Sequence, residues 1–222
     1  MTKEDLIQEL RAYRVLKSPS LIRAFYTVDR RGFVPPEYAE EAYGDYPISI
    51  GFGQTISQPL TVAFMLELLL PRPGDSVLEI GAGSGWQAAL LGYVVSGGGT
   101  VSGKRRQCAP VVTMERVLPL CDMASANIRG CPVIRKGVVE VVAGDGSRGH
   151  ARCAPYDRII AAATTGSIPV AWKEQLRVGG RIVAPVEDTI EVHDKLSTGD
   201  YNIRVYHGFR FVPLVTDERE GG

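Results

Sequence analysis

Three side chains that can orient a reacting group stand close together in the stretch GFGQTISQP. Gln54, Thr55 and Ser57 supply an amide and two hydroxyls, which hydrogen-bond a carboxylate without carrying charge themselves. Pro59 follows them at a position suited to the first turn of a helix. We therefore interpret the stretch as a loop that orients a substrate, with ordinary helix capping by Ser57 or Thr55 as the alternative.

A glycine-rich turn, VLEIGAGSGW, comes between an apolar strand-like segment and a helix-like one. Gly81, Gly83 and Gly85 permit a tight bend, and the helix behind them offers free N–H groups and a positive dipole end to a ligand. The spacing G-x-G-x-G differs from the dinucleotide pattern G-x-G-x-x-G. Glu79 would repel a pyrophosphate, but it suits a ligand with an amine and a sulfonium, such as S-adenosylmethionine. From this turn we expect the cofactor to contact Glu79, Gly81, Ala82, Gly83, Ser84 and Gly85, the alternative being a purely structural turn.

Two later strand ends offer further cofactor contacts. Glu115, in VVTMER, is placed to take ribose hydroxyls, with Arg116 beside it, if the insertion SGGGTVSGKRRQCAP loops out ahead of this strand. An alternative register makes TVS the strand and leaves no acid there. Asp145 and Gly146, in VVAGDGSRG, are expected near the adenine, although Asp145 is equally typical of a simple turn.

The elements that must position these residues alternate between strands and helices after Pro59. This order predicts an α/β fold with a mostly parallel sheet and helices on both of its faces. The expected strands are 75–80, 111–115, 137–143, 156–163 and 181–185, and the expected helices are 59–70, 85–95, 118–128 and 169–176.

The flanking segments predict an N-terminal helical lobe and an antiparallel C-terminal edge. A capped helix starts after Thr2, and another covers 19–28, followed by a connection without either periodicity. The tail contains TIEV, YNIRVY and FRFVPLV, which alternate as strands do. We expect a single domain whose parts are 1–58 (helical lobe and substrate loop), 59–186 (cofactor-binding core) and 187–222 (sheet edge).

Composition excludes several classes of protein. Among 222 residues, 25 Lys and Arg balance 25 Asp and Glu, whereas nucleic-acid-binding domains are usually basic. The longest apolar run, 65–70, is far shorter than the roughly 20 residues of a membrane span. The charged N-terminus does not resemble an export signal. We expect a cytoplasmic monomer that binds neither nucleic acid nor membrane.

Cysteine and histidine patterns give no metal site. Cys108, Cys121, Cys131 and Cys153 lack CxxC spacing, and we expect them to be buried or idle thiols rather than bridged or metal-bound. The histidines do not cluster with carboxylates or cysteines at ligand spacing.

Several longer motifs together resemble one family, the protein-L-isoaspartate O-methyltransferases, which repair damaged asparagine and aspartate residues. The matching motifs are GQTISQP, VLEIGAGSG, MERVLPL, GDGSRG, APYDRIIAAA, QLRVGGRIVAPV and FVPLV. The resemblance implies the class I methyltransferase fold, S-adenosylmethionine as cofactor, and isoaspartyl proteins and peptides as partners.

The resemblance also implies roles for individual residues. It places Ser57 near the transferred methyl and the acceptor carboxylate, with Thr55 and Ile56 shaping the cofactor pocket. Such a carboxylate is already ionised at neutral pH, so alignment matters more than a strong base. An apolar lining suits the reaction, and Phe52, Ile56 and Trp86 are candidates, although Trp86 is equally typical of a core.

The sequence departs from the family at three places: the insertion 96–110, the segment AAATTGSIP around Thr164 and Thr165, and 193–203. These departures leave two alternatives open. One is a methyltransferase of the same fold with another carboxylate or protein acceptor. The other is an adaptor that binds the cofactor without turnover.

Overall fold

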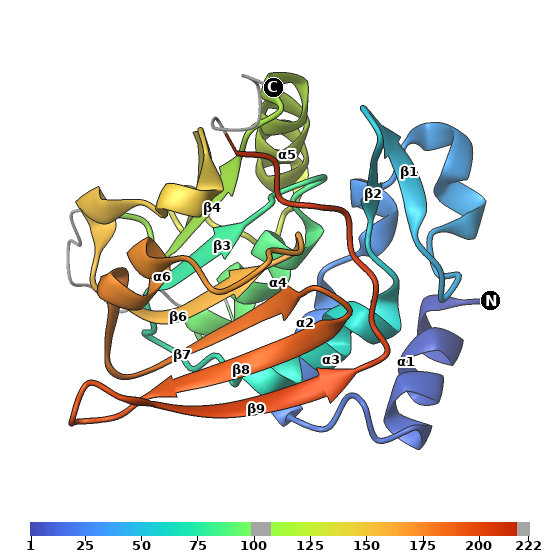
Figure 1. Ribbon diagram of the computed structural model, residues 1–222. Helices are drawn as coiled ribbons and strands as arrows, with labels where there is room; N and C mark the ends of the chain where they lie inside the picture. The colour runs from blue at the N-terminus through green and yellow to red at the C-terminus, as the bar shows by residue number, and fades with distance from the viewer. Residues whose placement is uncertain (99–107, 217–222) are drawn as a thin grey trace.

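The computed structural model describes residues 1–98 and 108–216, and a seven-stranded sheet of order β5-β4-β3-β6-β7-β8-β9 forms its centre (Figure 1). β5, β4, β3, β6 and β7 run parallel, and β8 and β9 add an antiparallel edge, which confirms the predicted fold class. The strands are β3 Val77–Ile80, β4 Val111–Glu115, β5 Val139–Ala143, β6 Tyr156–Ala161, β7 Leu176–Val186, β8 Thr189–Lys195 and β9 Tyr201–His207.

Helices cover both faces of this sheet. α2, α3, α4 and α5 lie behind it in Figure 1, and the short α6 lies in front. Successive side chains of β3 point to opposite faces of the sheet, so Val77 packs in the core behind the sheet and Leu78 packs in the core in front of it. The helices are α1 Lys3–Ala12, α2 Pro19–Thr27, α3 Pro59–Leu69, α4 Trp86–Val95, α5 Leu118–Gly130 and α6 Val170–Gln175.

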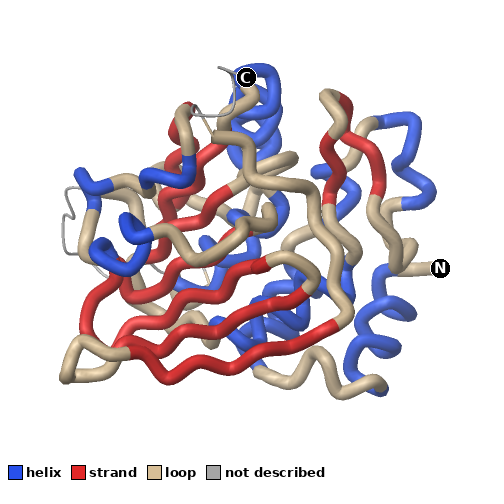
Figure 2. The backbone as a smooth tube through the Cα atoms, in the orientation of Figure 1, coloured by secondary structure: helices blue, strands red, loops and turns tan. Residues whose placement is uncertain are grey.

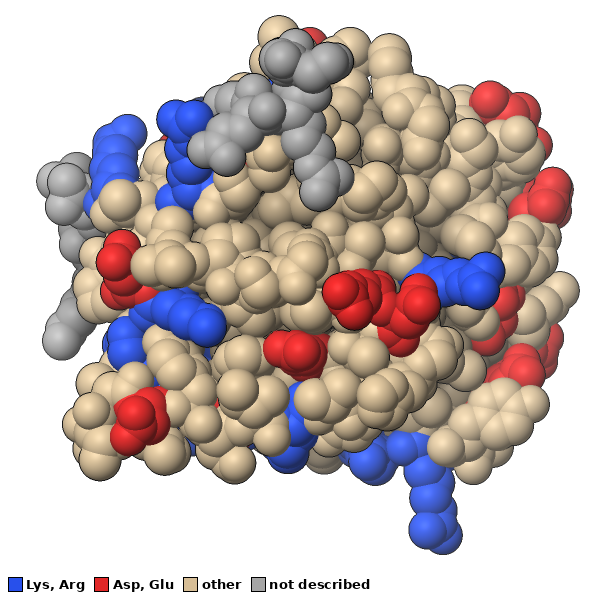
Figure 3. Space-filling view, viewed as in Figure 1, with Lys and Arg blue, Asp and Glu red and all other residues tan. Residues whose placement is uncertain are grey.

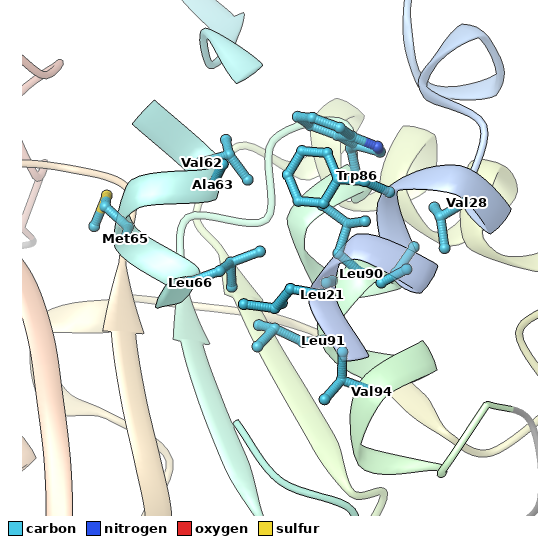
Figure 4. Close-up of a cluster of buried hydrophobic side chains, with 14 of the residues drawn as sticks. Leu21, Val28, Val62, Ala63, Met65, Leu66, Trp86, Leu90, Leu91 and Val94 are labelled. Carbon is cyan, nitrogen blue, oxygen red and sulfur yellow. The ribbon is translucent and has the colours of Figure 1, made fainter. Parts of the chain in front are cut away.

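One apolar core joins the N-terminal lobe to the central helices. Leu21 of α2, Leu66 of α3 and Leu90 of α4 are almost fully buried in it and lie together in Figure 4. Trp86 sits at the edge of this cluster, and Phe25 meets its ring edge-on at a centroid distance of 5.5 Å. The lobe is therefore packed directly against the helix that follows the glycine turn.

The N-terminal lobe contains structure that periodicity did not reveal. Thr2 caps α1 through a complete capping box with Asp5, as its pattern predicted. The connection after α2 holds two 3-10 helices and a two-stranded antiparallel hairpin, whereas we expected no regular element there. These elements are η1 Arg30–Phe33, η2 Pro36–Glu41, β1 Ile48–Gly51 and β2 Gln54–Ile56.

The last described segment, 208–216, is an extended strap rather than the sheet strand expected from FRFVPLV. It leaves β9 at Gly208 (φ +92°) and runs past the strand ends (Figure 2). Thr164 holds it in the middle, donating its N–H to the Val212 carbonyl and accepting from Leu214 N–H, both at 2.8 Å. Pro213 lacks an N–H, so this segment cannot form a complete ladder.

The prediction that all four cysteines are unbridged is wrong. Cys108 and Cys153 form a disulfide, while Cys121 and Cys131 are free and buried as expected. The bridge joins the segments just before β4 and β6, with its Cα atoms 5.8 Å apart. Sequence spacing could not show this proximity, because the two cysteines are 45 residues apart and the strands that follow them are separated by β3 in the sheet.

Within the described ranges, no helix is both long and apolar enough to cross a bilayer. The insertion 96–110 lies mostly outside these ranges, so the prediction that it loops out is untested.

Removing the disulfide should destabilise the fold. Closing a 45-residue segment restricts the unfolded chain, so Cys108→Ser with Cys153→Ser should lower the free energy of unfolding by about 2–4 kcal/mol. Urea unfolding measures this change. A reductant should destabilise the parent protein similarly and leave the double variant unchanged; equal stability of both proteins under oxidising conditions would contradict the bridge.

Candidate active site

A cavity of about 420 Å³ opens where the parallel strands end. The chain moves outward from β3 to β4 and β5 and then returns to β6 on the other side of β3, which makes a topological switch point, the usual ligand site of such sheets. The cavity brings together eleven of the predicted site residues: Gln54, Thr55, Ile56, Ser57, Gly81, Ala82, Gly83, Ser84, Glu115, Arg116 and Gly146.

The glycine turn takes a shape that requires positive φ angles. Gly81 and Gly85 have φ values of +91° and +89°, which strain any residue with a Cβ. A Cβ on Gly85 would also meet Ile128 and the Ala124 carbonyl at 3.1–3.2 Å. Gly85 is the N-cap residue of α4. It does not line the cavity, although we expected it to contact the cofactor.

Glu115 stands at the end of β4, as predicted, and its carboxylate is fixed by the backbone. It accepts from Gly83 N–H at 2.9 Å, from Arg116 N–H at 2.9 Å and from Val117 N–H at 3.0 Å. Carboxylate oxygens have about four acceptor sites, so this side chain can still accept from the hydroxyls of a ribose. The structure thus supports VVTME, rather than an earlier segment, as the second strand of the fold.

Glu79 is completely buried directly behind the cavity wall. Burial raises the pKa of its carboxyl to about 7, and the Glu115 carboxylate adds to this rise. The Thr113 hydroxyl and Gln87 amide nearby oppose the rise only partly, and neither makes a complete hydrogen bond with it. A buried carboxylate without partners is costly, and a cationic ligand in the cavity would offset that cost.

Other unpartnered polar atoms lie next to Glu79. Among the described residues, the Thr113 hydroxyl, the Gln87 amide nitrogen and the Trp86 indole nitrogen are buried without a hydrogen-bond partner. Gln87 and Trp86 both line the cavity. The indole and amide nitrogens are donors, so they fit an acceptor such as the carboxylate at the amino-acid end of S-adenosylmethionine, whereas the Glu79 carboxylate suits its ammonium.

Residues 54–58 line the cavity together with the glycine turn, and the alternative of helix capping by Ser57 or Thr55 is wrong. α3 begins at Pro59 with Gln58 as its N-cap residue, which makes no side-chain capping bond. The capping acceptor comes from Asp45, whose Oδ1 accepts from Leu60 N–H at 2.8 Å. Ser57 therefore has no capping role, and it is one of the residues that line the cavity.

Some predicted residues do not reach the cavity. Asp145 lies between two lining glycines, but its carboxylate accepts from Ser147 N–H at 2.9 Å, as in the alternative of a turn-forming aspartate. Phe52 is 60% exposed at the hairpin tip and is not part of the apolar lining. Thr164 and Thr165 hold the strap and the end of β7 instead of lining the cavity.

Trp86 has both of the roles that the sequence left open. Its ring is 3% exposed and packs in the core, and it also forms part of the cavity wall together with Ile56. An apolar wall of this kind keeps water away from a reacting centre.

Sequence reasoning missed the strap and a buried arginine. Residues 210–215 line the cavity, with Arg210 at the end nearest α3, where Phe209 stacks on Phe64 at 5.1 Å. Arg30 donates to the Ser57 carbonyl at 3.0 Å from beneath the loop. FVPLV is one of the motifs shared with the family, but the strand-like alternation of FRFVPLV led us to predict a sheet strand instead of a segment that lines the cavity. Nothing in the sequence around Arg30 distinguishes it from a surface arginine.

Across the described ranges, no group of three or more histidine, cysteine, aspartate or glutamate side chains could hold a metal ion.

Comparisons with known proteins show the family of this chain. Residues 1–219 match the family model described as protein-L-isoaspartate(D-aspartate) O-methyltransferase. A protein-L-isoaspartate O-methyltransferase of Staphylothermus marinus is 43% identical over 221 residues, covering 96% of this chain and 93% of its own.

Solved structures are similar over nearly the whole chain. One protein-L-isoaspartate O-methyltransferase superposes with a TM-score of 0.80 at 27% identity, covering 97% of this chain and 67% of its own. Another, described as a putative enzyme of this kind from Plasmodium falciparum in complex with S-adenosyl-L-homocysteine, has a TM-score of 0.82 at 19% identity and covers 97% and 99%.

The sheet order, the glycine turn at its switch point and the acidic end of β4 define a class I methyltransferase. Within that class, the chain belongs to the protein-L-isoaspartate(D-aspartate) O-methyltransferase family.

The raised pKa of Glu79 predicts how stability varies with pH in the protein without cofactor. Between pH 4.5 and about pH 7, Glu79 is ionised in the unfolded chain but still protonated in the folded protein. The free energy of unfolding therefore falls as pH rises through this interval. Between pH 5 and 8, the parent should lose about 2–3 kcal/mol more unfolding free energy than Glu79→Gln. Urea unfolding at both pH values measures this.

Glu140→Gln provides the control, because Glu140 is an exposed glutamate on β5. It should leave the pH dependence of the parent unchanged. The burial argument fails if Glu79→Gln and the parent lose equal stability over this interval.

Proposed function

We propose that the protein transfers a methyl group from S-adenosylmethionine to the α-carboxylate of L-isoaspartyl residues in damaged proteins. One observation carries this proposal: Ser57 and the glycine turn line the same cavity, on segments that are far apart in the sequence. Family membership supports both the cofactor and the acceptor.

The cofactor would be held from three sides. The N-terminal end of α4 would face its amino-acid end, with the buried Glu79 as a counter-charge. Glu115 would accept from the ribose hydroxyls, and Gly146 lines the cavity where the adenine is expected. S-adenosylmethionine, once bound, supplies an activated methyl on a sulfonium.

On the opposite side of the cavity, Gln54, Thr55 and Ser57 would hold the acceptor. Their amide and hydroxyl groups donate to a carboxylate and align one of its oxygens with the methyl. Such alignment can contribute roughly 7–11 kcal/mol to lowering the barrier. The protein needs no strong base, because a carboxylate of this type is ionised at neutral pH.

The charges around the acceptor end also favour an anion. Arg210 lines the cavity on the strap, and it has no ion-pair partner among the described residues. On the face shown in Figure 3, the described acidic and basic side chains are interspersed, so no field of one sign covers it. A local cation at the cavity therefore attracts the carboxylate that is to be methylated.

Loss of charge during transfer suits the apolar part of this cavity. A cation and an anion become two neutral groups, so excluding water does not penalise the transition state as it would one that develops charge. Ile56 and Trp86 provide that exclusion. Monomeric state, cytoplasmic location and lack of nucleic-acid binding stay predictions.

Matched peptides that contain either isoaspartate or aspartate at one position test the proposal. With methyl-labelled S-adenosylmethionine, only the isoaspartyl peptide should be labelled. Ser57→Ala should lower kcat on the order of 10–100-fold, because one orienting group is lost, while cofactor affinity stays unchanged.

The outcomes separate the alternatives. Equal labelling of both peptides would indicate a methyltransferase with a broader carboxylate acceptor. Cofactor binding without labelling of either peptide would indicate an adaptor. Arg31→Met, a change at an exposed residue, is the control and should retain parental activity.

A further inference from the structure

Arg30 is a buried cation that ties three backbone segments of the N-terminal lobe together. Its guanidinium is 2% exposed and donates from Nη1 to the Ala42 carbonyl at 2.5 Å. From Nη2 it donates to the Ser57 carbonyl at 3.0 Å and the Tyr46 carbonyl at 3.4 Å. One of the three segments is thus the loop that carries the predicted catalytic hydroxyl.

The same guanidinium contacts the cofactor side of the cavity. Its carbon lies 5.1 Å from the centroid of the Trp86 ring, within the range of a cation–π contact. Trp86 is the first residue of α4, directly after Gly85, and lines the cavity. Arg30 therefore contacts both the acceptor loop and the helix that begins at the glycine turn.

Asp45 holds the loop from the other direction. Its Oδ1 caps α3 through Leu60 N–H, and its Oδ2 accepts from Gln58 Nε2 at 3.0 Å. Burial lowers the pKa of Arg30 to about 10, and the Asp45 charge opposes this change, so the guanidinium stays charged at neutral pH. The residues from Ser57 to Leu60 are held by groups of opposite charge.

We propose that Arg30 is a positioning residue that fixes the Ser57 hydroxyl relative to the cofactor turn; this inference rests on the proposed function. Burying a charged guanidinium is unfavourable, and an apolar residue would fill the space without that cost. The guanidinium offers a rigid planar fork of donors, which an ammonium cannot reproduce at three carbonyls. Its geometry therefore serves to hold the loop.

The test compares Arg30→Lys and Arg30→Met with Arg31→Met. Arg31 is the adjacent exposed arginine, and its guanidinium also lies over an aromatic ring, that of Tyr43 at 5.3 Å. Titration with S-adenosylhomocysteine counts the binding-competent sites of each protein, so that misfolded molecules do not enter the rates.

Both Arg30 variants should bind S-adenosylhomocysteine with nearly parental affinity. Their kcat per competent site on an isoaspartyl peptide should fall on the order of 10–100-fold, because a shift of about 1 Å can cost that much. Arg30→Lys should retain more activity than Arg30→Met. Arg31→Met should match the parent.

Hydrogen exchange provides a readout that does not depend on activity. In the ligand-bound Arg30 variants, the Leu60 amide, which donates to Asp45, should exchange faster than in the parent, while amides of β4 stay unchanged. An unchanged kcat per site with unchanged exchange would overturn the proposal. A parallel loss of cofactor affinity and kcat would also overturn it, since that outcome indicates general packing.

The two proposals fail separately. If the parent protein labels no isoaspartyl peptide, the proposed function is wrong. The exchange of the Leu60 amide still shows whether Arg30 fixes the loop.

Discussion

Two backbone hydrogen bonds hold the glycine turn against the end of β4, and the site depends on them. Gly81 and Ala82 both donate to the Met114 carbonyl, at 2.8 and 3.0 Å. Glu115, the next residue, accepts from Gly83 and so closes the turn from the other side. The turn can take this shape because glycine allows positive φ. The first two strands of the core thus form the cofactor side of the cavity together.

The acceptor side belongs to a different part of the chain and is held by polar groups rather than by the sheet. Arg30 and Asp45 fix the backbone around Ser57, and the core between α2 and α4 joins this lobe to the helix after the turn. Glu79 and its unpartnered neighbours are costly to bury in the protein alone. A bound ligand with an ammonium for Glu79 and an acceptor for the neighbouring N–H groups would complete the site.

Local sequence patterns predicted much of the fold and of the cavity lining. The features that they missed depend mostly on long-range contacts. The alternation of strands and helices gave the parallel sheet, and Glu115 followed from its position at a strand end. The hairpin of β1 and β2 is an exception, because Ile48 and Ile50 do alternate with polar or small residues ahead of Gly51, and our prediction of a connection without regular elements missed this pattern. The Cys108–Cys153 bridge and the strap along Thr164 depend on segments that meet only after folding, and no sequence spacing encodes them.

A crystal structure with S-adenosylhomocysteine and an isoaspartyl peptide would show whether the two sides of the cavity are separated by the space of a single methyl group. The cofactor sulfur should lie beside the glycine turn, and the Ser57 hydroxyl should donate to the peptide carboxylate. The carboxylate should approach the sulfur with space only for a methyl between them. An empty glycine turn, or a peptide carboxylate bound away from Ser57, would contradict the account.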